Sequence, residues 1–127
     1  MKGLTLWGLV VYYLATGLFI SVFPLLFYET GPGVSDTGPY NMHFLRDVGF
    51  AFTVSAFGIA YGLRRKSKPL VVFGTAWIAM HALFHLILWC VHPSVEGVIN
   101  DLILVVLPAA VATYLGLTYM DPEMTRR

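Results

Sequence analysis

The chain has 127 residues, a length that fits one domain, but its composition is that of a membrane protein. Hydrophobic residues make up 57% of the sequence and charged residues 12%, whereas soluble domains carry about 25% charged residues. A formal net charge of +1 gives no indication of a nucleic-acid partner, and the single cysteine, Cys90, excludes an internal disulfide framework and a multi-cysteine metal site.

Four segments are apolar over a length that can cross a bilayer, whose hydrocarbon layer of roughly 30 Å takes about 20 helical residues. We therefore expect an all-α integral membrane protein, in which residues 1–127 form one antiparallel four-helix bundle. The first segment is longer than the apolar part of a secretory signal and precedes no small-residue cleavage site, so we expect it to be retained. The expected spans are residues 4–28, 42–63, 70–91 and 97–119.

The connections between these spans predict how the chain lies in the membrane. Residues 29–41 are rich in Gly, Pro, Ser, Asp and Thr, which predicts a loop with no further element. Residues 64–68 form a basic turn, and residues 92–96 form the last connection. Cytoplasmic loops are enriched in Lys and Arg. Only Arg46 of the eight basic residues falls on the other side, so we expect both termini to be cytoplasmic.

A small-residue pattern occurs in the second span. Gly58 and Gly62 are four residues apart, a spacing that lets two membrane helices approach closely. Such patterns are common in membrane helices, so we expect Gly58 and Gly62 to pack against a neighbouring helix within the bundle.

The polar residues inside the spans gather at the end expected to be extracytoplasmic. His43 and Asp47 are four residues apart, as are His81 and His85, so each pair shares one helical face. A rise of 1.5 Å per residue places Asp47, His85 and Asp101 at nearly one depth, roughly 8–9 Å below the rim. The candidate ligand or metal residues are His43, Asp47, His81, His85 and Asp101, with Asn41, Arg46, His92, Glu96 and Asn100 in support.

Two interpretations of this cluster give it a binding role. One is a transition-metal site, in which His81 and His85 supply imidazoles and an aspartate supplies an oxygen ligand. Haem is not favoured, since an axial pair from different helices such as His43 and His85 is its only sequence support. The other is a metal-free pocket for a small polar ligand, open to the extracytoplasmic side. Whether the protein is an enzyme stays open.

A third interpretation is structural. A charged side chain inside a bilayer costs about 2.5–3.5 kcal/mol and needs a partner. Arg46 would pair with Asp101 or Glu96, and Asp47 with a histidine, so that the charges only fix the helix register. The chain would then be a non-catalytic accessory subunit of a larger membrane complex, or a subunit of a homo-oligomer.

One motif resembles a known group of proteins. The stretch Pro39-Tyr40-Asn41-Met42-His43-Phe44-Leu45-Arg46-Asp47-Val48-Gly49, followed by His81 and His85, resembles small uncharacterised bacterial four-helix membrane proteins that are broadly DoxX-like. They share an Asn-x-His-x-x-Arg-Asp-x-Gly opening of the second helix. The resemblance implies a multi-pass protein of the bacterial cytoplasmic membrane. DoxX-like members are associated in various cases with redox or sulfur-linked membrane systems, sometimes as partner subunits.

Overall fold

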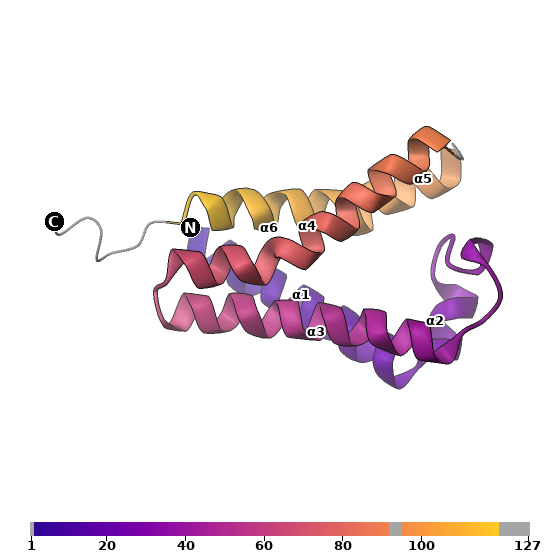
Figure 1. Cartoon of the computed structure of the whole chain (residues 1–127), viewed down its shortest axis with the longest axis horizontal. Helices are drawn as coiled ribbons and strands as arrows, with labels where there is room; N and C mark the ends of the chain where they lie inside the picture. The colour runs from indigo at the N-terminus through magenta and orange to yellow at the C-terminus, as the bar shows by residue number, and fades with distance from the viewer. Residues whose placement is uncertain (1, 92–94, 120–127) are drawn as a thin grey trace, which may run out of the picture.

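The computed structural model describes residues 2–91 and 95–119, and every regular element in these ranges is helical (Figure 1). Four of its helical stretches are long and apolar enough to cross a membrane. The expected all-α fold with four candidate spans is therefore confirmed. The elements are α1 (Lys2–Val22), α2 (Pro24–Thr30), the 3-10 turn η1 (Ser35–Thr37), α3 (Met42–Arg64), α4 (Lys68–Val91), α5 (Val95–Asp101), the π-helical η2 (Leu102–Val106) and α6 (Leu107–Leu117).

The first expected span, residues 4–28, is divided between α1 and α2 at Pro24. Proline has no backbone N–H, and it disfavours the helical conformation of the residue before it. Phe23 accordingly has φ −122° and ψ 55°, outside the helical region. As a result α1 ends at Val22, and α2 leads into a loop that contains the short helix η1, where we expected no further element.

Glycines allow the long helices to pack closely. A Cβ atom on Gly49 of α3 would lie 2.8 Å from the carbonyl oxygen of Gly17 in α1, so both positions require glycine. On the other side of α3, Gly58 and Gly62 face α4, where a Cβ on Gly62 would lie 2.5 Å from the Val71 nitrogen. The expected packing of the Gly58–Gly62 pair within the bundle is confirmed. α4 packs in turn against α6.

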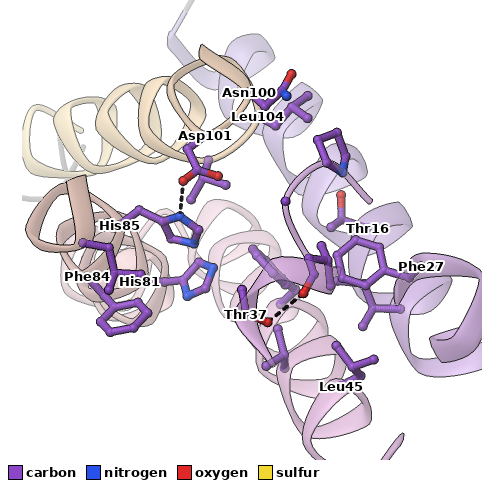
Figure 2. A pocket seen from close by; sticks show the side chains of 18 of the residues that line it. Thr16, Phe27, Thr37, Leu45, His81, Phe84, His85, Asn100, Asp101 and Leu104 are labelled. Carbon is purple, nitrogen blue, oxygen red and sulfur yellow. Dashed lines mark hydrogen bonds and ion pairs between the residues drawn. The ribbon is translucent and has the colours of Figure 1, made fainter. Parts of the chain in front are cut away.

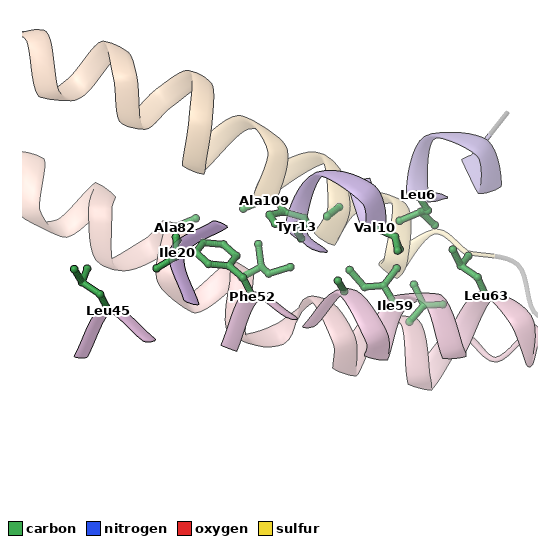
Figure 3. Packing of buried hydrophobic residues seen from close by; sticks show 14 residues of the cluster. Leu6, Val10, Tyr13, Ile20, Leu45, Phe52, Ile59, Leu63, Ala82 and Ala109 are labelled. Atoms are coloured by element: carbon green, nitrogen blue, oxygen red, sulfur yellow. The ribbon is translucent and has the colours of Figure 1, made fainter. Parts of the chain in front are cut away.

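The buried core runs along the bundle and leaves many large apolar side chains outside it (Figure 3). Tyr13, Ile20 and Ile59 are almost completely buried, whereas Leu4 is 80% and Phe73 is 79% exposed. An apolar exterior of this kind is solvated by lipid, and helices satisfy all their backbone hydrogen bonds internally, as a bilayer requires. The chain therefore has the surface of a multi-pass membrane protein.

The bundle is closed at one end and open at the other (Figure 1). At the closed end, Lys2 Nζ donates a hydrogen bond to the Thr118 carbonyl oxygen at 3.3 Å, which joins α1 to the end of α6. At the other end α4 and α5 diverge from α3, while α2 stays packed on α1 and α3. The open end holds most of the predicted polar cluster.

The π-helical segment η2 lies at the base of this opening. In a regular α-helix the Leu104 carbonyl would accept from residue 108, but Pro108 has no N–H to donate. The Tyr12 hydroxyl of α1 donates to the Leu104 carbonyl oxygen and so joins α1 to η2. π-Helical turns often occur at functional sites, and this one directly follows Asp101.

Candidate functional site

A cleft of about 1350 Å³ opens between α1, α2 and α3 on one side and α4, α5 and η2 on the other. This volume exceeds the range of about 300–1,000 Å³ that is typical of small-molecule pockets. Its walls are mainly aromatic and aliphatic, and polar groups line it from both sides, with the two histidines and Asp101 on the α4–α5 side (Figure 2). The polar lining residues are Tyr12, Thr16, Asp36, Thr37, His81, His85, Asn100 and Asp101.

One face of α4 carries an aromatic stripe with a spacing of four residues. The rings of Trp77 and His81 are stacked, with centroids 4.9 Å apart and planes at 11°. The His85 ring follows at 4.8 Å from that of His81, in an edge-to-face arrangement. The Phe52 ring of α3 packs in edge-to-face arrangements with the rings of Trp77 and His81. This packing restricts both imidazoles to few orientations.

His85 and Asp101 form the central polar pair of the cleft. His85 Nδ1 lies 2.7 Å from Asp101 Oδ2, and Trp89 Nε1 donates to the same oxygen at 3.2 Å. The two side chains are only 20% and 24% exposed. Since Asp101 ends α5, the pair also links α4 to the fourth candidate span. Its contacts are thus with His85 and Trp89, and the alternative pairing of Arg46 with Asp101 is not found.

His81 is the second polar group on this wall. Its ring points into the cleft beside His85, opposite Phe27 and Leu45 (Figure 2). Within residues 2–91 and 95–119, neither of its nitrogens hydrogen-bonds to a protein group. His81 therefore offers a vacant hydrogen-bonding position to a molecule in the cleft.

The structure does not bring His43 and Asp47 into the cleft. His43 Nδ1 lies 3.3 Å from Asp47 Oδ2, and the two side chains are 88% and 62% exposed. The face of α3 that lines the cleft carries Leu45, Val48 and Phe52 instead. A common depth does not fix the direction of a side chain, so of the five candidates only His81, His85 and Asp101 converge.

The supporting residues have separate roles. Arg46 Nε donates to the Ser21 carbonyl oxygen at 3.3 Å and ties α3 to the last turn of α1. Asn41 caps α3, since its Oδ1 accepts a backbone N–H of the first turn at 3.1 Å. Asn100 lines the cleft beside Asp101. His92 lies outside the described residues, and the Glu96 side chain is likewise not described.

The loop after α2 supplies part of the cleft wall. Pro32, Gly33 and Val34 line it together with the polar Asp36 and Thr37. The base of the loop is held because the Tyr28 hydroxyl donates to the Gly38 carbonyl oxygen at 2.9 Å. The sequence left open whether the loop of residues 29–41 folds over the site. Trp89 was not among the predicted site residues, although its position four residues after His85 was a usable signal.

The geometry of the site differs from that of a metal centre. In the described part of the chain, no three His, Cys, Asp or Glu side chains are arranged to hold one metal ion. Asp101 Oδ2 already accepts hydrogen bonds from two side chains. Asp101 thereby orients His85, and the His85 Nε2 atom is left for a ligand.

Comparison of the chain with protein-family models, curated proteins and solved structures finds no match. The resemblance to DoxX-like proteins stays a prediction. Because folds do not determine functions, function is inferred from the geometry of the site.

Proposed function

We propose that this protein is a membrane-embedded binding protein for a small amphipathic molecule. The polar head of this molecule would lie against His81, His85 and Asp101, and its apolar part would occupy the rest of the cleft. The observation that carries the proposal is the partly buried His85–Asp101 pair in the wall of a large and mainly apolar cleft. Ionisable groups are costly inside a membrane and mark binding sites and pathways there.

The walls of the cleft support an apolar body on the ligand. Phe27, Phe44 and Phe84 line it from three different helices, and Leu88 continues the apolar surface along α4. Covering such surface is favourable by roughly 25 cal/mol per Å². A purely polar ligand, or a metal ion with its bound water, would not cover this apolar surface and would not gain this free energy.

We further propose an antiparallel bundle in a cell membrane, with both termini cytoplasmic and the cleft on the extracytoplasmic side. The distribution of basic residues supports this orientation. Lys2 and the turn of residues 64–68, which holds four basic residues, lie at the closed end, and Arg46 is the basic residue of the described segments at the open end. The DoxX-like resemblance is compatible with this arrangement.

Native mass spectrometry of the full chain released from mild detergent tests the proposed function. We expect the wild type and the control variant His43→Ala to carry the same non-covalent small molecule, because His43 lies outside the cleft. His85→Ala should lose this molecule. If all three proteins carry identical lipid, or none carries any molecule, the polar cluster is structural and the proposal fails.

A further inference from the structure

We infer that the head of the bound amphiphile is an uncharged hydroxyl group. This inference rests on the proposed function and names the ligand class. The charges around the cleft give the first step. Asp36 and Asp101 are its acidic residues, and no Lys or Arg occurs among the described residues that line it. A fatty acid, sulfate or phosphate head would meet like charges without a cationic partner, which disfavours binding.

The hydrogen bonding of His85 gives the second step. An ionised carboxylate only accepts hydrogen bonds, so the His85 Nδ1 atom beside Asp101 Oδ2 must carry the proton. In the neutral imidazole the other nitrogen, Nε2, is then an acceptor. Orientation of a histidine by a carboxylate on one nitrogen fixes the tautomer in this way. A neutral His85 held in this tautomer calls for a ligand that donates a hydrogen bond to Nε2.

His81 gives the third step. Its ring centroid is 4.8 Å from that of His85, and its nitrogens have no protein partner in the described ranges. A neutral imidazole has one N–H donor and one acceptor nitrogen. A hydroxyl group both donates and accepts, so it can donate to His85 Nε2 and accept from His81. A ketone can only accept and so cannot donate to His85 Nε2, and a quaternary ammonium group can neither donate nor accept.

The shape of the cleft agrees with a long apolar body behind this head. Phe27 and Leu45 lie across the cleft from the two histidines (Figure 2). At the open end α2 packs on α1 and α3, away from α4 and α5.

Tryptophan fluorescence of the full chain in lipid nanodiscs tests the head group. Trp77 stacks on His81 and Trp89 donates to Asp101, so a bound brominated chain should quench both; Trp7→Phe serves as the background. The probes share one brominated alkyl chain and end in an alcohol, a methyl ketone, a carboxylate or a trimethylammonium group. We expect the alcohol to bind most tightly, by about three- to tenfold for each hydrogen bond that another head loses.

Two variants distinguish the hydrogen bond that His85 Nε2 accepts from the effect of Asp101 in fixing the His85 tautomer. His85→Asn keeps an amide N–H near the position of Nδ1 but removes the Nε2 acceptor. Asp101→Asn removes the carboxylate that fixes the tautomer. Each should weaken alcohol binding by about three- to tenfold and reduce the preference over the ketone. His43→Asn and Asp47→Asn make the same chemical changes in the exposed pair and should leave binding unchanged.

The results distinguish the inference from the proposed function. Equal or tighter binding of the carboxylate, ketone or ammonium probe overturns the hydroxyl head and leaves the cleft as a binding site. Absence of quenching by all four probes in the wild type overturns the proposed function as well. The comparison of the four probes on the wild-type protein is sufficient to test the head group. The test therefore does not depend on whether the variants fold.

Discussion

Two neighbouring tyrosines in α1 differ in what their hydroxyl groups contact. The Tyr12 hydroxyl donates to the Leu104 carbonyl oxygen, whereas the Tyr13 hydroxyl is buried and has no partner in the described part of the chain. Tyr12→Phe should therefore destabilise the protein by about 0.5–1.5 kcal/mol, because the hydrogen bond to the Leu104 carbonyl is lost. Tyr13→Phe removes an unsatisfied group and should cost nothing. SDS-induced unfolding in mixed micelles measures both changes.

A double-mutant cycle assigns the Tyr12 effect to Pro108. Pro108→Ala restores a backbone N–H four residues after Leu104. Tyr12→Phe should then cost less in the Pro108→Ala background than in the wild type. An equal cost in both backgrounds would mean that Tyr12 acts through packing and not through this carbonyl.

Residue spacing alone predicted part of the candidate site. The four-residue interval put His81 and His85 on one face, and the depth estimate put Asp101 near His85, as the structure has them. The same reasoning placed Asp47 with them, but its side chain faces outward. Periodicity fixes which residues share a face, and the contacts of Gly49 and Leu45 with the rest of the bundle decide which face of α3 turns inward.

At the scale of whole elements, the α1–α3 interface depends on two glycines. A Cβ on Gly49 would meet both Ser21 and Gly17 of α1, so Gly49→Ala should overpack the interface and destabilise the protein by about 1–3 kcal/mol. Gly8 is the matched control, since nothing lies within 4 Å of a Cβ there. Mixed-micelle unfolding should show a loss for Gly49→Ala and none for Gly8→Ala. Equal effects would contradict the close approach.

Hydropathy predicted the helices better than their interruptions. The expected spans 42–63 and 70–91 lie close to α3 and α4, because about 20 consecutive apolar residues leave few alternatives to a spanning helix. Hydropathy does not register the missing N–H of Pro24, so the division of the first span was not predicted. Nor could it predict that the loop around Asp36 lines the cleft, since loops have no periodicity that fixes their path.

For the whole molecule, metal content separates two interpretations that the sequence left open. The protein purified in mild detergent without chelator should contain no transition metal at one ion per chain, because no three His, Cys, Asp or Glu side chains in the described part of the chain are arranged to hold one ion. Elemental analysis with an absorption spectrum measures this. A stoichiometric metal that disappears in a His81→Ala/His85→Ala double variant would contradict the proposed ligand and restore the metal site.

The orientation of the bundle determines which compartment the cleft faces, and Lys and Arg at the closed end favour a cytoplasmic position for that end. Cysteine labelling tests this in a Cys90→Ser background, which removes the single native thiol. Asp36→Cys lies in the loop at the open end, and Ser67→Cys lies in the basic turn between α3 and α4. A membrane-impermeant maleimide added to intact cells should label Asp36→Cys and spare Ser67→Cys until the cells are opened. The reverse pattern would place the cleft mouth in the cytoplasm. The ligand would then have to be supplied from inside the cell, while the histidine geometry of the site would be unaffected.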